Sequence, residues 1–357
     1  MTTSRATSPI TTGGFPSVRP AASQPLDAGL DTLRQGRDAS GATPMTRASV
    51  EENRARIVAG HRLCSAGPEV AKVEELAVAA NADCAAVPVR VYTPDAEVAA
   101  TLVYLHGGGW FTGDLDYADE LCRFLAQDAG LRVVSVDYRL APEHPYPLPL
   151  NDAEAALAWA AAEFPDVPLG ISGDSAGGNL AAATLLRARD GGPAVAFQVL
   201  VYPVTDSDFD RDSYRACEHG FPLGRADLEH CFAHYAPDPA VRVGVEVSPV
   251  RADLSGMPPA LVVVAGHDPL HDEGVAHAAR LQDAGVPVTL VDHPTLCHGF
   301  LRFTGASPAS TAARDDLVGL VARLARGDAT AADRELDDYH CSDLSLTRRR
   351  FLEGDTR

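Results

Sequence analysis

The chain has 357 residues, 46% of them hydrophobic, which is enough for one large α/β domain or two ordinary domains. Its 49 acidic and 30 basic residues give a net charge of −19, which disfavours nucleic acids and anionic membrane surfaces as partners. The 7 cysteines contain no CxxC pair and are odd in number, which is typical of reduced thiols in a cytoplasmic protein rather than of a disulfide framework.

The two ends of the chain differ in composition from the rest. Residues 1–26 are rich in Ser, Thr, Pro and Gly and contain no apolar stretch like that of a signal peptide, so we expect a disordered tail without a membrane anchor. Residues 327–357 are rich in charged side chains, and we interpret them as a C-terminal extension.

From about Val73 onward, short apolar runs rich in Val, Ile and Leu alternate with longer segments of helical pattern. Strands that are apolar throughout and separated by helices indicate a mostly parallel sheet with helices on both faces. We assign residues 66–204 and 248–326 to this α/β core, with its site beyond the carboxyl ends of the strands. The predicted strands are, in chain order, 87–94, 100–107, 132–138, 167–172, 196–203, 259–266 and 286–292.

The interval 205–247 interrupts the alternation with polar and aromatic residues. Its length and its place between two core strands predict a helical cap over the strand ends, joined by residues 27–65. Aromatic side chains of the interval have few other places to bury their surface, which predicts a bounded pocket. Trp110 and Phe111 are expected to form part of its substrate-binding wall. The aromatic residues of the interval are Phe209, Tyr214, Phe221, Phe232 and Tyr235.

A histidine and three consecutive glycines, residues 106–109, stand at the end of the second predicted strand. Glycine is expected there where the backbone approaches another group closely or adopts a positive φ, although a simple tight turn is the alternative. We expect the amides of Gly107, Gly108 and Gly109 to face a substrate oxygen, joined by the amide of Ala176.

The segment 173–177, Gly-Asp-Ser-Ala-Gly, lies between a predicted strand and a predicted helix. A sharp strand-to-helix turn exposes the serine Oγ and leaves room only for small residues two positions to either side. The helix that follows directs the positive end of its dipole toward the serine. We therefore expect Ser175 to be a nucleophile, which in turn needs a base, an orienting carboxylate and an anion site.

Candidates for the carboxylate and the base lie later in the chain. Asp268 directly follows the strand predicted at 259–266, whereas Asp272 falls at the start of a helix, where an acidic residue is more simply a partner of the helix dipole. His298 follows the last predicted strand and a short loop, and we favour it as the base. His293 is closer to the strand end and remains an alternative. Three further histidines surround the acid, namely His267, His271 and His277.

Together these elements resemble the hormone-sensitive lipase family, the bacterial family IV esterases, over nearly all of residues 45–325. The resemblance rests on HGGGW (106–110), DYRLAPEHPYP (137–147), GDSAGGNLA (173–181), SPVRADLSGMPPALVVVAGHDPLHDEG (248–274) and CHGF (297–300). It implies an α/β-hydrolase fold and carboxylesterase activity. The family pattern implies Ser175 as nucleophile, Asp268 as acid and His298 as base. It also implies that the oxyanion donors are Gly108, Gly109 and Ala176.

The chain departs from the family in a few places. The family often has arginine where this chain has His271, which alters an ion pair but touches no assigned role. The cap residues match only loosely, and the resemblance explains neither end of the chain. Substrate choice is therefore left open.

Other groups of residues have a structural interpretation. The three prolines of segment 137–147 indicate a rigid loop that braces the floor of the site. The histidines and aspartates between 267 and 277 have the composition of a metal site, but Pro269 interrupts them and the serine machinery is complete elsewhere. Cys297, next to the candidate base, is interpreted as a packing thiol.

These interpretations predict a serine esterase that cleaves short-chain carboxylic esters through an acyl-enzyme, with no metal or organic cofactor. The alternatives are an amidase, a lactonase or a deacetylase acting on a specialised metabolite, or a non-catalytic ligand-binding protein on the same fold. We expect a cytoplasmic protein whose partner is a small-molecule ester, without nucleic acid or stable membrane association. The question of a homodimer is left open.

Overall fold

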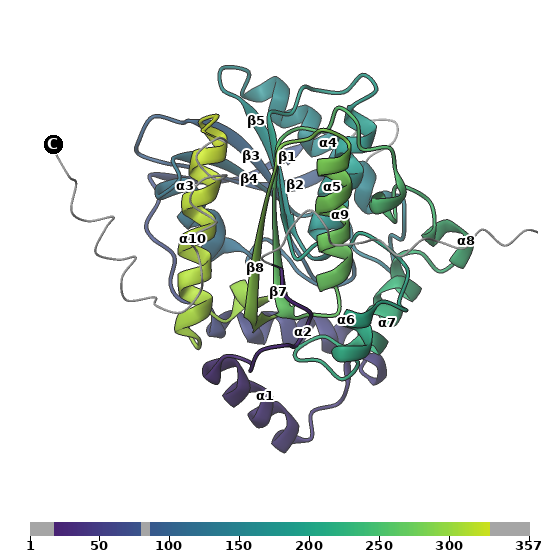
Figure 1. Cartoon of the computed structure of the whole chain (residues 1–357). Coiled ribbons are helices and arrows are strands. Elements are labelled where there is room, and N and C mark those ends of the chain that lie inside the picture. The colour runs from purple at the N-terminus through teal and green to yellow at the C-terminus, as the bar shows by residue number, and fades with distance from the viewer. Residues whose placement is uncertain (1–17, 80–85, 329–357) are drawn as a thin grey trace, which may run out of the picture.

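The computed structural model describes residues 18–79 and 86–328 (Figure 1). In this part of the chain eight strands form a single open sheet, in the spatial order β1-β2-β4-β3-β5-β6-β7-β8. Their bounds are β1 (Lys72–Val78), β2 (Val87–Thr93), β3 (Ala100–Leu105), β4 (Leu131–Val136), β5 (Leu169–Asp174), β6 (Phe197–Val201), β7 (Ala260–His267) and β8 (Val288–Cys297).

The sheet is parallel except at one edge. β2 pairs antiparallel with β1 and with β4, and every pair from β4 to β8 is parallel. All seven predicted strands are present, and the expected α/β fold is confirmed. Strand β1 was not predicted, because the charged residues Lys72, Glu74 and Glu75 interrupt the apolar pattern that marks the other strands.

Helices cover both faces of the sheet (Figure 1). On one side lie α3 (Asp119–Gln127) and α10 (Pro308–Ala325), and on the other lie α4 (Leu148–Glu163), α5 (Ala176–Ala188) and α9 (His271–Asp283). Side chains of a strand point alternately to the two faces. In β3, accordingly, Val103 and Leu105 join the core under α4 and α5, while Leu102 and Tyr104 join the core under α3 and α10.

The segments predicted as a cap are helical. Figure 1 shows α1 (Ala28–Ser40), α2 (Val50–Gly60), α6 (Asp212–Ala216) and α7 (Arg225–Tyr235) together at one end of the molecule, with α8 (Pro239–Arg242) to the side. Arg54 ties α2 to the core, because its Nε donates to the carbonyl of Phe111 at 2.9 Å and its guanidinium pairs with Glu143 at 2.7 Å. The division of the chain into cap and core units stays a prediction.

Residues 18–26, which we expected in the disordered tail, instead lie against the core. The amide of Ala22 donates to the carbonyl of Gly266 at 2.7 Å, and the amide of Arg19 donates to Asp292 at 3.2 Å. Gly266 belongs to β7 and Asp292 to β8, so this segment is bound to the sheet. The expectation that residues 18–26 are disordered is therefore corrected. Residues 1–17 and 329–357, which contain the rest of the two predicted tails, lie outside the described residues.

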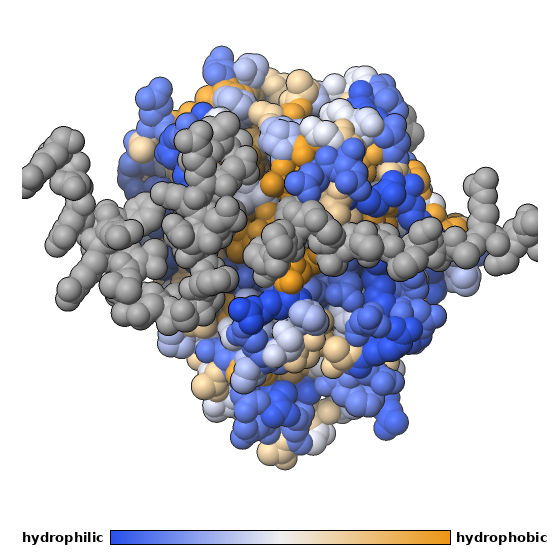
Figure 2. All heavy atoms as spheres, viewed as in Figure 1, coloured by the Kyte–Doolittle hydropathy of each residue, from blue (hydrophilic) through white to orange (hydrophobic). Residues whose placement is uncertain are grey.

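Surface polarity agrees with the acidic composition. On the face shown in Figure 2, hydrophilic side chains cover much of the lower half of the molecule, where Figure 1 places the first two helices and α6 and α7. Within residues 18–79 and 86–328, no helix is long and apolar enough to cross a membrane.

Candidate active site

Ser175 occupies a strained turn between β5 and α5. Its φ is 55° and its ψ is −118°, a region that non-glycine residues adopt only when the surrounding structure enforces it. The turn is crowded, because a Cβ on Gly173 would lie 2.3 Å from the backbone of Gly177. A Cβ on Gly177 would lie 1.9 Å from the carbonyl oxygen of Leu105. Only glycine fits two positions before and two positions after the serine, where the sequence pattern predicts small residues.

The serine, the histidine and the acid form a connected line of hydrogen bonds. Ser175 Oγ lies 2.9 Å from His298 Nε2, and His298 Nδ1 lies 2.7 Å from Asp268 Oδ2. The second oxygen of Asp268 accepts the amide of Leu270 at 2.8 Å. All three side chains are buried, with Ser175 5% and His298 7% exposed. A carboxylate can only accept, so the Nδ1 atom carries the proton and Nε2 presents its lone pair to the hydroxyl.

The competing residues lie in other surroundings. Asp272 lies in the first turn of α9, as predicted, and accepts the amide of Ser213 from α6 at 2.8 Å. His293 packs edge-on against Phe300 at a centroid distance of 5.3 Å. Neither residue bonds to His298 in the structure, so the geometry favours Asp268 as the acid.

His271 is buried beside two carboxylates. Its Nδ1 lies 3.0 Å from Asp272, and its Nε2 lies 3.7 Å from Asp292, a distance at which the attraction is electrostatic rather than a hydrogen bond. Burial acts to lower the pKa of His271, but the two carboxylates outweigh it and raise that pKa to about 9. The imidazole is therefore a buried cation at neutral pH.

The glycine-rich loop has positive φ values of 119° at Gly108 and 62° at Gly109. Gly107 differs from the expectation that all three amides face the substrate. Its amide donates to Asp174 Oδ1 at 2.8 Å, so it is directed into the protein. The candidate oxyanion donors are therefore Gly108, Gly109 and Ala176, the set that the family pattern implies.

Aromatic packing holds the start of this loop. The ring of His106 stacks on Tyr138 at 4.3 Å, and the hydroxyl of Tyr138 donates to the carbonyl of His106 at 2.7 Å. Burial lowers the pKa of His106 to about 4, so its ring is neutral at pH 7. Tyr138 belongs to segment 137–147, which therefore braces the loop as the prolines suggest.

Trp110 and Phe111 lie between the glycine loop and α7. Trp110 stacks on Tyr235 at 4.3 Å and meets Phe232 edge-on at 5.1 Å, and no part of it is exposed. Phe111 is 1% exposed and contacts the ring of His234 at 5.0 Å. These contacts show both side chains packed against the helix, while their role in substrate binding stays a prediction.

Two residues near the triad were not singled out from the sequence. Asp174 is the last residue of β5 and is buried directly before Ser175. Its position inside the Gly-Asp-Ser motif was an available signal. Tyr202 follows β6 with a φ of 33°, and its ring lies 4.9 Å from the ring of His298. Nothing in the local sequence indicates that contact, because it joins two distant segments.

A hollow of about 470 Å³ lies beside His267, between α1 and the chain that follows α6. This volume is within the range of about 300–1,000 Å³ that is usual for small-molecule sites. We call it the α1–α6 hollow. Its lining includes Leu26, Asp31, Arg34, Arg215, Phe221 and His267.

Among the described residues, no group of three or more His, Cys, Asp or Glu side chains could hold a metal ion.

Comparisons with known proteins agree with this fold and geometry. Residues 102–302 match a family model described as the alpha/beta hydrolase fold. The chain is 43% identical over 239 residues to the carboxylesterase NlhH of Mycobacterium tuberculosis, covering 64% of this chain and 75% of that protein. It is 37% identical over 290 residues to an ethyl acetate hydrolase of Pseudomonas putida, covering 78% of this chain and 91% of that protein.

Solved structures extend the match to most of the chain. A hyperthermophilic esterase from the archaeon Pyrobaculum calidifontis superimposes with a TM-score of 0.76 and 33% identity, over 86% of this chain and 99% of that one. The chain belongs to the α/β hydrolase family, as expected. Within the family it is an ester hydrolase, of the carboxylesterase kind that the resemblance implied.

Proposed function

We propose that the protein hydrolyses short-chain carboxylic esters through an acyl-enzyme on Ser175. The observation that carries the proposal is the hydrogen-bonded line from Ser175 Oγ through His298 to Asp268, with spacings of 2.9 and 2.7 Å. Such a line has the spacing needed for a nucleophile, its general base and the group that orients the base.

Each group would act at a defined atom. His298 Nε2 takes the proton of Ser175 Oγ as that oxygen attacks the ester carbonyl. The carbonyl oxygen becomes negative, and the amides of Gly108, Gly109 and Ala176 donate to it. The imidazolium then protonates the departing alcohol, and a water molecule repeats the sequence on the acyl-enzyme to release the acid. Nδ1 of His298 keeps its proton throughout and donates it in a hydrogen bond to Asp268.

The preference for small esters is supported by the name of a relative. One relative that covers 78% of the chain bears the name ethyl acetate hydrolase, and ethyl acetate has two carbons on each side of the ester oxygen. The relatives' names favour an enzyme over a non-catalytic ligand-binding protein.

The proposed setting is the cytoplasm, with a small-molecule ester as partner and no nucleic acid. The net charge of −19 supports the exclusion of nucleic acid, and the free, unbridged thiols Cys64, Cys122, Cys217, Cys231 and Cys297 support a reducing compartment.

A panel of substrates tests the proposal. The purified protein is assayed on p-nitrophenyl esters of increasing acyl length and on matched amides, lactones and acetylated amines. The proposal expects the highest kcat/KM on short esters. A higher kcat/KM on the amide or the lactone would replace it with the corresponding alternative.

A further inference from the structure

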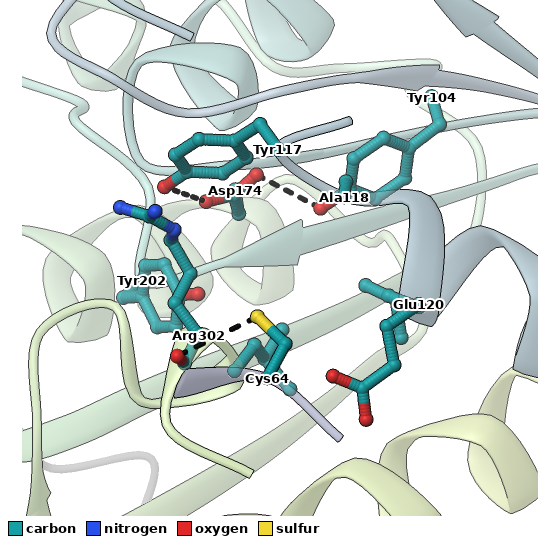
Figure 3. A pocket seen from close by; sticks show the side chains of 10 residues that line it. Cys64, Tyr104, Tyr117, Ala118, Glu120, Asp174, Tyr202 and Arg302 are labelled. Carbon is teal, nitrogen blue, oxygen red and sulfur yellow. Dashed lines mark hydrogen bonds between the residues drawn. The ribbon is translucent and has the colours of Figure 1, made fainter. Parts of the chain in front are cut away.

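Asp174 is a buried carboxylate that takes no part in the triad. It is 1% exposed, and its oxygens accept three hydrogen bonds. Oδ1 accepts the amide of Gly107 and the hydroxyl of Tyr104, both at 2.8 Å, and Oδ2 accepts the hydroxyl of Tyr117 at 3.1 Å. Figure 3 shows the two tyrosine rings turned toward the carboxylate. All three partners donate, so both oxygens of the carboxylate are satisfied as acceptors.

The glycine loop approaches this carboxylate so closely that a side chain cannot intervene. A Cβ on Gly107 would lie 2.4 Å from Asp174 Oδ2 and 2.7 Å from the hydroxyl of Tyr117. The first glycine of the loop is therefore required for close approach, whereas Gly108 and Gly109 are required for their positive φ.

The surroundings of Asp174 have no room for a substrate. The cavity in Figure 3 has a volume of about 10 Å³, and its lining includes Tyr104, Tyr117, Asp174, Tyr202 and Arg302. This is about the size that holds one water molecule. The carboxylate therefore faces a closed interior behind the nucleophile, and its action on the reaction must pass through its hydrogen-bond partners.

The chain order makes those partners relevant to the oxyanion. Asp174 is directly followed by Ser175 and Ala176, and Gly107 is directly followed by Gly108 and Gly109. The single bond from Gly107 N–H to the carboxylate thus joins the two backbone segments that carry the nucleophile and all the candidate oxyanion donors. The bond lies in a water-excluded interior, where a charge-assisted hydrogen bond is strong.

We propose that Asp174 is a positioning residue that sets the distance between the glycine-loop amides and the nucleophile, with Tyr104 and Tyr117 holding its carboxylate in place. This inference rests on the proposed function, because the oxyanion donors have meaning only in that reaction. It assigns Asp174 no contact with the substrate. Its loss should weaken binding of the transition state more than binding of the ground state.

The test compares three variants with the wild type. Asp174→Asn keeps the shape but removes the charge, and Tyr117→Phe removes one donor and keeps the ring. The control is Tyr92→Phe. Tyr92 lies on β2, away from the glycine loop, and is also fully buried. Its hydroxyl likewise donates to a carboxylate, that of Asp119, at 2.7 Å. Each protein is measured for thermal midpoint, for kcat and KM on p-nitrophenyl butyrate, and for inhibition by a trifluoromethyl ketone.

The ketone reports on the oxyanion site directly. Ser175 Oγ adds to its carbonyl carbon, the proton passes to His298, and the carbonyl oxygen becomes the oxyanion. We expect Asp174→Asn to lower kcat by about 10²-fold, as for loss of one oxyanion donor, with KM within about twofold of wild type. The binding affinity for the ketone should fall by a similar factor. Tyr117→Phe should shift kcat and ketone affinity in the same direction by about tenfold. Tyr92→Phe should leave all three kinetic constants unchanged.

Several outcomes would overturn the inference. One is an Asp174→Asn protein whose kcat and ketone affinity stay within twofold of wild type. Another is a variant whose KM and whose inhibition constant for the ketone rise by the same factor while its thermal midpoint falls. That pattern would indicate a purely structural effect. If Asp174→Asn does not fold, the same two criteria applied to Tyr117→Phe decide the matter. An inactive wild type would overturn the proposed function as well, whereas an active wild type with insensitive variants would overturn this inference alone.

Discussion

Replacing Asp268 with asparagine is expected to lower kcat by about 10⁴-fold, because it gives His298 the wrong tautomer. In the structure, Oδ1 of Asp268 accepts the amide of Leu270 at 2.8 Å, which directs Oδ2 to His298 Nδ1 at 2.7 Å. An asparagine that keeps the Leu270 bond turns its amide NH₂ toward Nδ1. That nitrogen must then be an acceptor, so the imidazole proton moves to Nε2 and faces Ser175 Oγ, where no base remains. A 10⁴-fold loss corresponds to about 5.5 kcal/mol of transition-state stabilisation.

The matched control is Asp272→Asn, four residues away. Asp272 accepts the amide of Ser213 at 2.8 Å and lies 3.0 Å from His271, so its change affects the contact between α6 and α9 rather than the base. We expect kcat within about tenfold of wild type and a lower thermal midpoint. Both variants are assayed on p-nitrophenyl butyrate at several pH values. A larger loss of kcat in Asp272→Asn than in Asp268→Asn would refute the assignment of the acid.

Three further predictions follow from the same structure. Because the pKa of His271 is raised to about 9, its stabilising contribution is complete below pH 6.5 and is lost as pH rises through 9, on the order of 3 kcal/mol at most. Urea unfolding at pH 6.5 and 9.5 should therefore show a larger loss of stability in wild type than in His271→Arg, and equal losses would contradict the reasoning. Acyl chains should raise kcat/KM only up to about two to eight carbons, by about 0.8 kcal/mol for each fully buried methylene. A steady rise through twelve and sixteen carbons would rule out a bounded pocket, and emulsified triglycerides should be poor substrates. Cys297 is fully buried and its pKa is raised well above the usual range by burial, so Cys297→Ala should keep kcat within a few-fold of wild type. Abolished turnover with an intact fold would show that the thiol takes part in the chemistry.

The strands and the meeting of Ser175, His298 and Asp268 were predictable from the sequence because their signals are local. Each central strand is mostly apolar, and the turn around Ser175 needs small residues at fixed positions. Asp268 and His298 each follow a predicted strand, and the parallel topology brings such strand ends to one edge of the sheet. Strand β1 was missed because an exposed edge strand need not be apolar.

Contacts between distant segments were not predictable. The bond from Gly107 to Asp174 joins residues 67 positions apart, and the sequence alone suggested that this amide faced the substrate. Residues 18–26 have the composition of a disordered tail, yet Ala22 bonds to Gly266 across the fold. Composition reports how little apolar surface a segment can bury, but it does not report a backbone partner elsewhere in the chain.

Covalent labelling of the nucleophile tests the central claim most directly. The protein is treated with a fluorophosphonate probe, the adduct is located by peptide mass spectrometry, and turnover of p-nitrophenyl acetate is measured in parallel with Ser175→Ala. The account predicts a single adduct on Ser175, and neither labelling nor turnover in the alanine variant. An adduct on another residue, or a Ser175→Ala protein that hydrolyses the ester at near wild-type rate, would contradict it.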